Sequence, residues 1–75
     1  MRYTITRQFD VTDEQPELWT VAAAHDYLEQ AVAWLIREGR IPHMTNAYQD
    51  MGDECAIAVI ELSDRDTALM LKLAL

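Results

Sequence analysis

The sequence predicts a small α+β domain of element order ββαββα, in which a four-stranded antiparallel sheet carries two helices on one face. Two stretches 37 residues apart support this order, because they follow one pattern. Each has an acidic turn residue, an apolar strand-like run, a helix-start signal and then a small residue. The first leads from Glu17 to Ala31, and the second leads from Glu54 to Ala68. We therefore expect a strand–strand–helix unit that occurs twice.

Length and composition indicate one domain over residues 1–75, since the chain has 75 residues and 51% of them are hydrophobic. A core of this size rarely supplies more than about 3–5 kcal/mol of net stability. The single cysteine, Cys55, leaves no internal disulfide and fits a reducing compartment. We find neither a signal peptide nor an apolar run of roughly 20 residues, so we expect a cytoplasmic protein without a membrane span.

The net charge of −7 is large for this length and repels nucleic acid and anionic lipid. The six basic residues are scattered and form no stripe that could bind phosphates. Direct binding to nucleic acid or to a membrane is therefore disfavoured.

The first strand is expected over residues 2–9, because polar and apolar side chains alternate there. Tyr3, Ile5 and Phe9 point one way, with Arg7 as the one departure. The polar segment 10–17, which contains Pro16, ends this strand.

Residues 18–24 fit two structures. As a second strand they place Trp19, Val21 and Ala23 on one face. As part of one long helix over residues 16–38, in an alternative βαββα order, they extend an apolar stripe at helical spacing. That stripe would contain Leu18, Val21, Ala22, His25, Leu28, Val32 and Leu35.

Two observations favour the strand for this segment. The sequence Asp26-x-x-Glu29 has the form of a capping box, which would start a helix after the strand. The opposite face of a long helix would also present Tyr27 and Trp34 to solvent. We therefore expect a strand over residues 18–24 and a helix from Tyr27 to Glu38.

The second half of the chain has clearer signals. Gly39 ends the helix, residues 44–51 form a third strand, and Gly52 and Asp53 mark a turn. Residues 55–62 are apolar on both faces, so this strand is expected at the centre of the sheet. Ser63 is expected to cap the last helix. One face of a four-stranded sheet would stay uncovered, which favours a homodimer or a partner.

Acidic residues gather in the two connections of the predicted unit. They are Asp10, Asp13, Glu14 and Glu17 in the first, and Asp50, Asp53 and Glu54 in the second. If both connections are hairpin turns at one end of the sheet, they form a negative patch that could dock on a basic protein surface. An unbroken helix over residues 16–38 would remove the first hairpin and would be expected to scatter these carboxylates. Trp19, Trp34 and Tyr27 are candidate aromatic anchors for the same partner.

No motif of metal binding or catalysis is present. The acids do not match a calcium loop, and G-x-S-x-G is absent. His25 and His43 have no second His or Cys at ligand spacing, and His43 with Asp50 is the one titratable pair that we considered for an enzyme. We expect no enzyme, no cofactor and no metal site.

The end of the chain, from Ile60 to Leu73, contains Asp64-x-x-x-Ala68. It resembles the strand–"D-x-x-x-A"–helix tail of small, mostly uncharacterised phage accessory proteins. That resemblance implies no activity, but small acidic phage proteins are often inhibitors of host machinery, including CRISPR systems. With the acidic patch, it leads us to expect a phage-borne, anti-CRISPR-like inhibitor in the host cytoplasm that docks on a basic surface of a nucleic-acid-binding complex. The alternative is an assembly module that forms a homodimer through the open sheet face.

Overall fold

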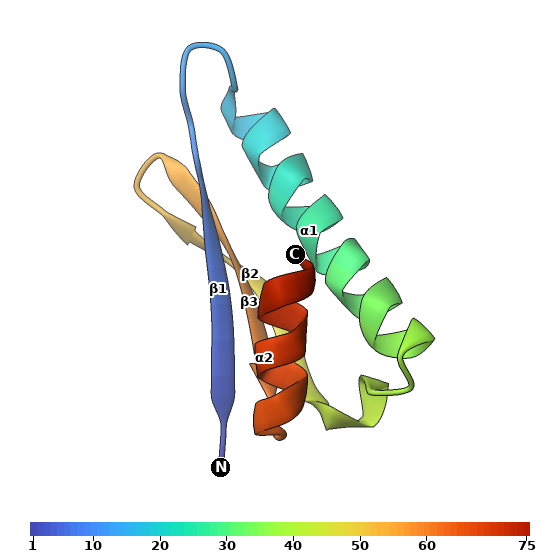
Figure 1. Ribbon diagram of the computed structural model, residues 1–75. Helices are drawn as coiled ribbons and strands as arrows, with labels where there is room; N and C mark the ends of the chain where they lie inside the picture. Colours follow the sequence, from blue (N-terminus) through green and yellow to red (C-terminus); the bar gives the residue numbers. More distant parts are fainter.

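The computed structural model describes all 75 residues and has an α+β fold of order βαββα (Figure 1). Its elements are β1 (Tyr3–Asp10), α1 (Glu17–Arg37), the short 3₁₀ helix η1 (Ile41–His43), β2 (Met44–Gly52), β3 (Cys55–Leu62) and α2 (Arg65–Ala74). The prediction of an α+β domain with two helices and an antiparallel sheet is confirmed. The sheet has three strands, so the predicted fourth strand and the order ββαββα are wrong.

Strand β3 lies between β1 and β2 and pairs antiparallel with both. Six of its eight residues are buried, because β3 has a neighbouring strand on each side and one of its faces packs against the helices. Alternate residues of β3, such as Ala58 and Ile60, face the helices, and Ile5 of β1 joins them because it pairs with Ile60. The central position predicted for this strand is confirmed.

Residues 18–24 form the first two turns of α1 and not a strand. Thr20, Ala24, Tyr27, Ala31 and Trp34 recur at helical spacing, and all five are buried. The objection that a long helix would expose Tyr27 and Trp34 fails, because both residues lie on the face that packs on the sheet. The alternative order with one long helix over residues 16–38 is therefore the correct one.

The expected capping box lies in the middle of α1 and starts no helix. Asp26 and Glu29 are both exposed, and Glu29 contacts Nε2 of His25 at 2.9 Å. The helix instead starts after Pro16, which has extended backbone angles at the N-cap. It ends at Arg37, and Gly39 follows in the left-handed conformation with φ of 69°.

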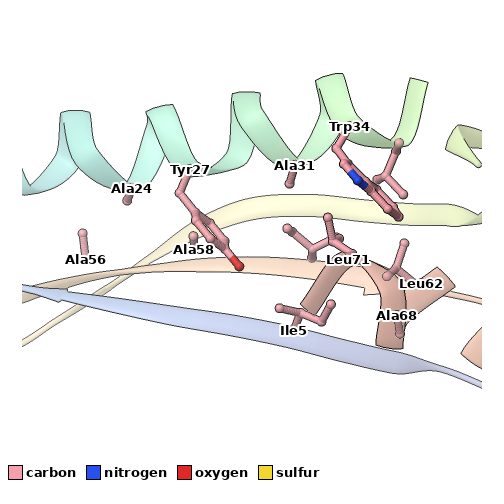
Figure 2. Close-up of a cluster of buried hydrophobic side chains, with 12 residues drawn as sticks. Ile5, Ala24, Tyr27, Ala31, Trp34, Ala56, Ala58, Leu62, Ala68 and Leu71 are labelled. Atoms are coloured by element: carbon pink, nitrogen blue, oxygen red, sulfur yellow. The ribbon is translucent and has the colours of Figure 1, made fainter. Parts of the chain in front are cut away.

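The core lies between the sheet and the two helices, and alanines make the contact of α1 with β3 close (Figure 2). Ala24 and Ala31 of α1 face the sheet, and Ala56 and Ala58 of β3 face the helix; all four are fully buried. Leu71 of α2 fills the space toward the other end of the cluster. With alanine on both sides, any larger side chain in this contact must push the two elements apart.

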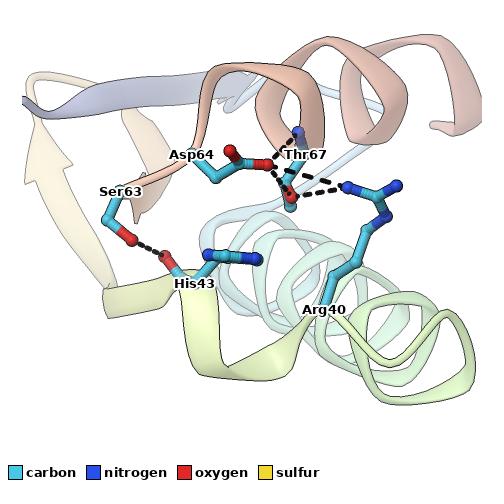
Figure 3. A network of polar contacts seen from close by, with 5 residues as sticks. All are labelled: Arg40, His43, Ser63, Asp64 and Thr67. Carbon is cyan, nitrogen blue, oxygen red and sulfur yellow. Dashed lines mark hydrogen bonds and ion pairs between the residues drawn. The ribbon is translucent and has the colours of Figure 1, made fainter.

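Helix α2 is capped by Asp64. The prediction that Ser63 caps this helix is therefore wrong. One carboxylate oxygen of Asp64 accepts hydrogen bonds from the backbone N–H of Thr67 at 3.0 Å and from its hydroxyl at 2.6 Å (Figure 3). Ser63 donates its hydroxyl to the carbonyl oxygen of His43 at 3.2 Å and so joins the start of β2. Asp64 is one residue nearer to the free N–H groups, and its charge favours the positive end of the helix.

The sheet face opposite the helices is uncovered. The alternating pattern places Thr4, Thr6 and Gln8 of β1 on this face. On β3, Cys55 and Val59 of this face are buried by their neighbours, and Ile57 between them is half-buried. This face therefore leaves less apolar surface exposed than the sequence suggested.

Candidate functional site

The two acidic connections meet at one end of the sheet. Because β1 and β2 both run antiparallel to β3, the end of β1 and the turn between β2 and β3 lie side by side. Asp10 and Gly52 both pair with Cys55, one from each neighbouring strand. The backbone N–H of Val11 then donates a hydrogen bond to the carbonyl oxygen of Glu54 at 2.7 Å. We call this part of the molecule the acidic end.

The long helix α1 does not scatter the carboxylates, so the expectation that it would do so is wrong. The place where β1 ends is fixed by its pairing with β3, whatever element follows it. Each of the seven predicted residues is exposed there or on the first residue of α1: Asp10, Asp13, Glu14, Glu17, Asp50, Asp53 and Glu54. The other six acidic residues equal the six basic residues in number, so the seven carboxylates of the acidic end account for the net charge of −7.

The first connection is held by short hydrogen bonds. Thr12 and Gln15 bond each other through both backbone N–H groups, at 2.9 and 3.2 Å, and the loop between them carries Asp13 and Glu14. The buried hydroxyl of Thr20 contacts the carbonyl oxygen of Pro16 at 3.1 Å and that of Asp10 at 3.5 Å. The first turn of α1 thus lies against the end of β1, and the backbone of the loop that carries the two acids is ordered.

The second connection is a two-residue turn made of Asp53 and Glu54. Glu54 has φ of 55°, which is the left-handed region that glycine or asparagine normally occupies. A Cβ atom added to Gly52 would come within 2.7 Å of Sγ of Cys55, so the residue before the turn has little room for a side chain. Glutamate at such a position costs about 1–2 kcal/mol relative to glycine.

Most basic residues lie toward the opposite end, where β1 begins, α1 ends and α2 begins. Arg40 donates to Oγ1 of Thr67 at 3.0 Å and contacts Oδ2 of Asp64 at 3.7 Å (Figure 3). The hydrogen bonds from Thr67, first from its hydroxyl and then from its backbone N–H, lower the pKa of Asp64. Arg2 contacts Glu61 at 3.5 Å. The molecule measures 38 Å along its longest axis, and charge is unevenly distributed between its two ends.

The three candidate aromatic residues differ in how far they are exposed to solvent. Trp34 and Tyr27 are each only 9% exposed and belong to the core (Figure 2), so they are removed from the predicted partner-binding set. The ring of Tyr27 lies 6.1 Å from that of Phe9, and the Arg7 guanidinium stands 5.3 Å from both ring centres. Burial raises the pKa of Tyr27, against a smaller lowering effect of Arg7.

Trp19 is 67% exposed on the first turn of α1, next to Glu17 and the acidic end. Its neighbour Thr20 points inward, and the turn of about 100° between successive helical residues places Trp19 on the exposed flank of the helix. The sequence singled out Trp19 but missed Thr20, which positions it. A threonine four residues after Pro16, at the start of a possible helix, was the available signal.

The arrangement gives no support to a catalytic or metal-binding role. No three side chains of the types His, Cys, Asp and Glu come together in a way that could hold a metal ion. His43 precedes β2 and Asp50 lies near its far end, seven residues away, which is roughly 23 Å along a strand. The one titratable pair considered for an enzyme is therefore not brought together.

Comparison with known proteins adds no further identification: no family model, no curated protein and no solved structure matches this chain. Neither of the two helices combines the length and the apolar character that crossing a membrane requires. The site must therefore be interpreted from its own geometry and charge.

Proposed function

We propose that this chain is a non-enzymatic binding protein that docks through its acidic end on a basic surface of a larger protein. The observation that carries this proposal is the location of all the net charge at one end, on two connections joined by the hydrogen bond from Val11 to Glu54. Charge of one sign at a fixed place steers a partner of opposite charge and raises its rate of association.

The positions of the loop acids are defined before any partner arrives. The Thr12–Gln15 bonds and the anchored first turn of α1 hold Asp13 and Glu14, and the tight turn holds Asp53 and Glu54. Because the backbone of both connections is already ordered, binding avoids the entropy cost of ordering these loops. An acid at the left-handed position 54, where glycine would be less strained, supports a role for this charge beyond folding.

Trp19 supplies the apolar part of the proposed contact. Its exposed ring lies on the turn of α1 that follows the acidic connection. Tryptophan often dominates the affinity of an interface, whereas exposed charges mainly set the rate of association and its salt dependence. We expect charge to guide the partner to this end and Trp19 to hold it there.

A cluster of carboxylates on two ordered connections suits a surface that normally binds phosphates. We therefore propose a nucleic-acid-binding complex as the partner class, and an inhibitor that occupies its basic groove as the role. The resemblance of residues 60–73 to phage accessory proteins agrees with an anti-defence inhibitor of this kind. The alternative role, a homodimeric assembly module joined through the open sheet face, has less support because Cys55 and Val59 are already covered.

The test uses two triple variants with equal changes in charge. The first is Asp13→Lys, Glu14→Lys and Asp53→Lys at the acidic end. The matched control is Asp26→Lys, Glu38→Lys and Asp66→Lys, and all six side chains are exposed. The probe is an arginine-rich peptide of about 20 residues, with affinity measured by isothermal titration calorimetry at two salt concentrations.

We expect the acidic-end variant to lose about tenfold or more in affinity for the peptide and most of the salt dependence, while the control loses clearly less. The variant Trp19→Ala should weaken binding without changing the salt dependence. Equal losses for the two triple variants would mean that only net charge matters, and the docking proposal would then be wrong.

A further inference from the structure

Helix α1 carries an apolar stripe on the side that faces away from the sheet. Six positions on this side recur at alternating spacings of four and three residues, and four of them are apolar. We call them the outer stripe: Leu18, Ala22, His25, Glu29, Val32 and Ile36. A helix with one face on a sheet normally keeps its outer face polar, so this stripe lacks the partner that such a pattern requires.

Five of the six residues of the outer stripe are exposed, and Val32 is half-buried. Leu18 is 83% exposed and Ile36 is 60% exposed, and they lie near the two ends of the helix. A shallow groove of about 470 Å³ follows the stripe on the side of β2, where it reaches Ala47. Its walls are mostly apolar, with His25 and Glu29 as the polar exceptions.

The spacing indicates what kind of element covers the stripe. Alternating steps of three and four residues form the seam of two helices that pack side by side at a small crossing angle. The 21 residues of α1 give a seam roughly 30 Å long. An amphipathic helix of similar length is the element that fits this seam.

We propose that the covering element is α1 of a second copy of this chain, packed antiparallel. The steps along the stripe are four, three, four, three and four residues, which read the same in both directions. The stripe therefore fits a reversed copy of itself. Leu18 faces Ile36 of the second copy, Ala22 faces Val32, and His25 faces Glu29. A two-fold axis passes between the helices at the level of the turn from His25 to Glu29, as expected for an isologous dimer.

The two polar positions at the centre of the stripe favour the antiparallel direction over the parallel one. In the antiparallel pair, each His25 meets Glu29 of the second copy as well as Glu29 of its own chain, which it already contacts at 2.9 Å. In a parallel pair, Glu29 would meet Glu29 and His25 would meet His25. In each chain, two apolar residues precede this central polar pair and two follow it, and they form the rest of the contact between the helices.

The dimer is independent of the proposed docking on a basic partner, and it leaves the acidic ends free. Trp19 lies on the flank of α1, away from the outer stripe. Because the helices run in opposite directions, the two acidic ends lie at opposite ends of the dimer. One dimer could therefore occupy two basic surfaces at once, with the gain in apparent affinity that bivalent binding brings.

The first experiment measures the oligomeric state of the full chain by sedimentation equilibrium. We expect a dimer at micromolar concentrations for the natural sequence. Leu18→Lys and Ile36→Lys should each weaken dimerisation about tenfold or more, because each places a charge in the apolar part of the seam. The control is Leu73→Lys, which changes an equally exposed leucine of α2 outside the stripe and should leave the dimer intact.

The second experiment determines the direction of the helices by disulfide cross-linking. A mixture of chains with Ala22→Cys and chains with Val32→Cys should form a mixed disulfide, and neither should link to itself. Glu29→Lys should weaken the dimer, and His25→Glu added to it should restore association, because the pair at positions 25 and 29 is then exchanged. Both positions are exposed, so circular dichroism should report an unchanged fold.

Three results would overturn the proposal. The first is a chain that stays monomeric at all accessible concentrations. The second is a dimer that survives Leu18→Lys and Ile36→Lys, since it would use another surface, such as the free edge of β1 or the open sheet face. The third is self-linking of Ala22→Cys chains, which would show parallel helices.

Discussion

The hydroxyl of Thr20 donates a hydrogen bond to the carbonyl oxygen of Pro16 at 3.1 Å, and the carbonyl oxygens of Gln15 and Asp10 also lie within 3.5 Å of it. Thr20 is fully buried, so one side chain joins the start of α1 to the end of β1. This contact positions Trp19 and the first acidic connection, and it gives the first prediction.

Thr20→Val should lower the free energy of unfolding by about 0.5–1.5 kcal/mol, because the shape is kept while the side-chain hydrogen bond from Thr20 to Pro16 is lost. Urea unfolding followed by circular dichroism measures this change. Thr4→Val is the control, because Thr4 is exposed and makes no side-chain hydrogen bond. If both variants shift the urea midpoint equally, the contact of Thr20 does not fasten the helix.

Glu54→Gly should raise the free energy of unfolding by about 0.5–1 kcal/mol. Glycine relieves the strain of a positive φ, and the greater freedom of glycine in the unfolded chain offsets part of the gain. Asp53→Gly removes the same charge from a position without a positive φ, so it should bring no gain. Thermal unfolding of both variants compares them, and a loss of stability in Glu54→Gly would contradict the strain argument.

Asp64 should make the stability of the protein depend on pH in the acidic range. Hydrogen bonds from Thr67 lower the pKa of Asp64 in the folded state. A depressed pKa stabilises the fold above the ordinary value of 3.8, and this stabilisation is lost as the pH falls through the folded value. The advantage of the natural protein over Asp64→Asn should therefore shrink as the pH is lowered from 7 to about 3.

Melting temperatures at several pH values would measure that dependence, with Asp13→Asn as a control whose carboxylate accepts no hydrogen bond. A constant difference between the natural protein and Asp64→Asn across this range would show that the charge of the cap does not matter.

Ala58→Leu should lower the free energy of unfolding by about 1–3 kcal/mol. Ala58 is fully buried on β3 beneath α1, close to Tyr27 (Figure 2), and a larger side chain must displace the helix. Ala74→Leu adds the same atoms at an exposed position of α2 and should change little. A tolerated Ala58→Leu would mean that the contact of α1 with the sheet is looser than its alanines indicate.

The sequence predicted that the acidic connections lie at one end of the sheet, although the first of the two predicted hairpins does not exist. The acidic connections were expected at one end because two hairpins were assumed. They are at one end because β1 and β2 flank β3 in antiparallel register, which brings Asp10 and Gly52 to the same residue, Cys55. Exposure could not be predicted in the same way, since Trp19, Tyr27 and Trp34 are all large and amphipathic but only Trp19 stays outside.

The sequence alone determined the elements whose local pattern allowed one structure. The β-branched run of β3, the alternation of β1, the glycine after α1 and the helix after Asp64 each satisfy a single periodicity or stop signal. Residues 18–24 fit the periodicity of a strand and that of a helix, because a short apolar run with three alanines can form either structure. Only the tertiary structure decided between them: burying Thr20 and Ala24 against the sheet in line with Tyr27 and Ala31 requires helical spacing, and no local signal carries that information.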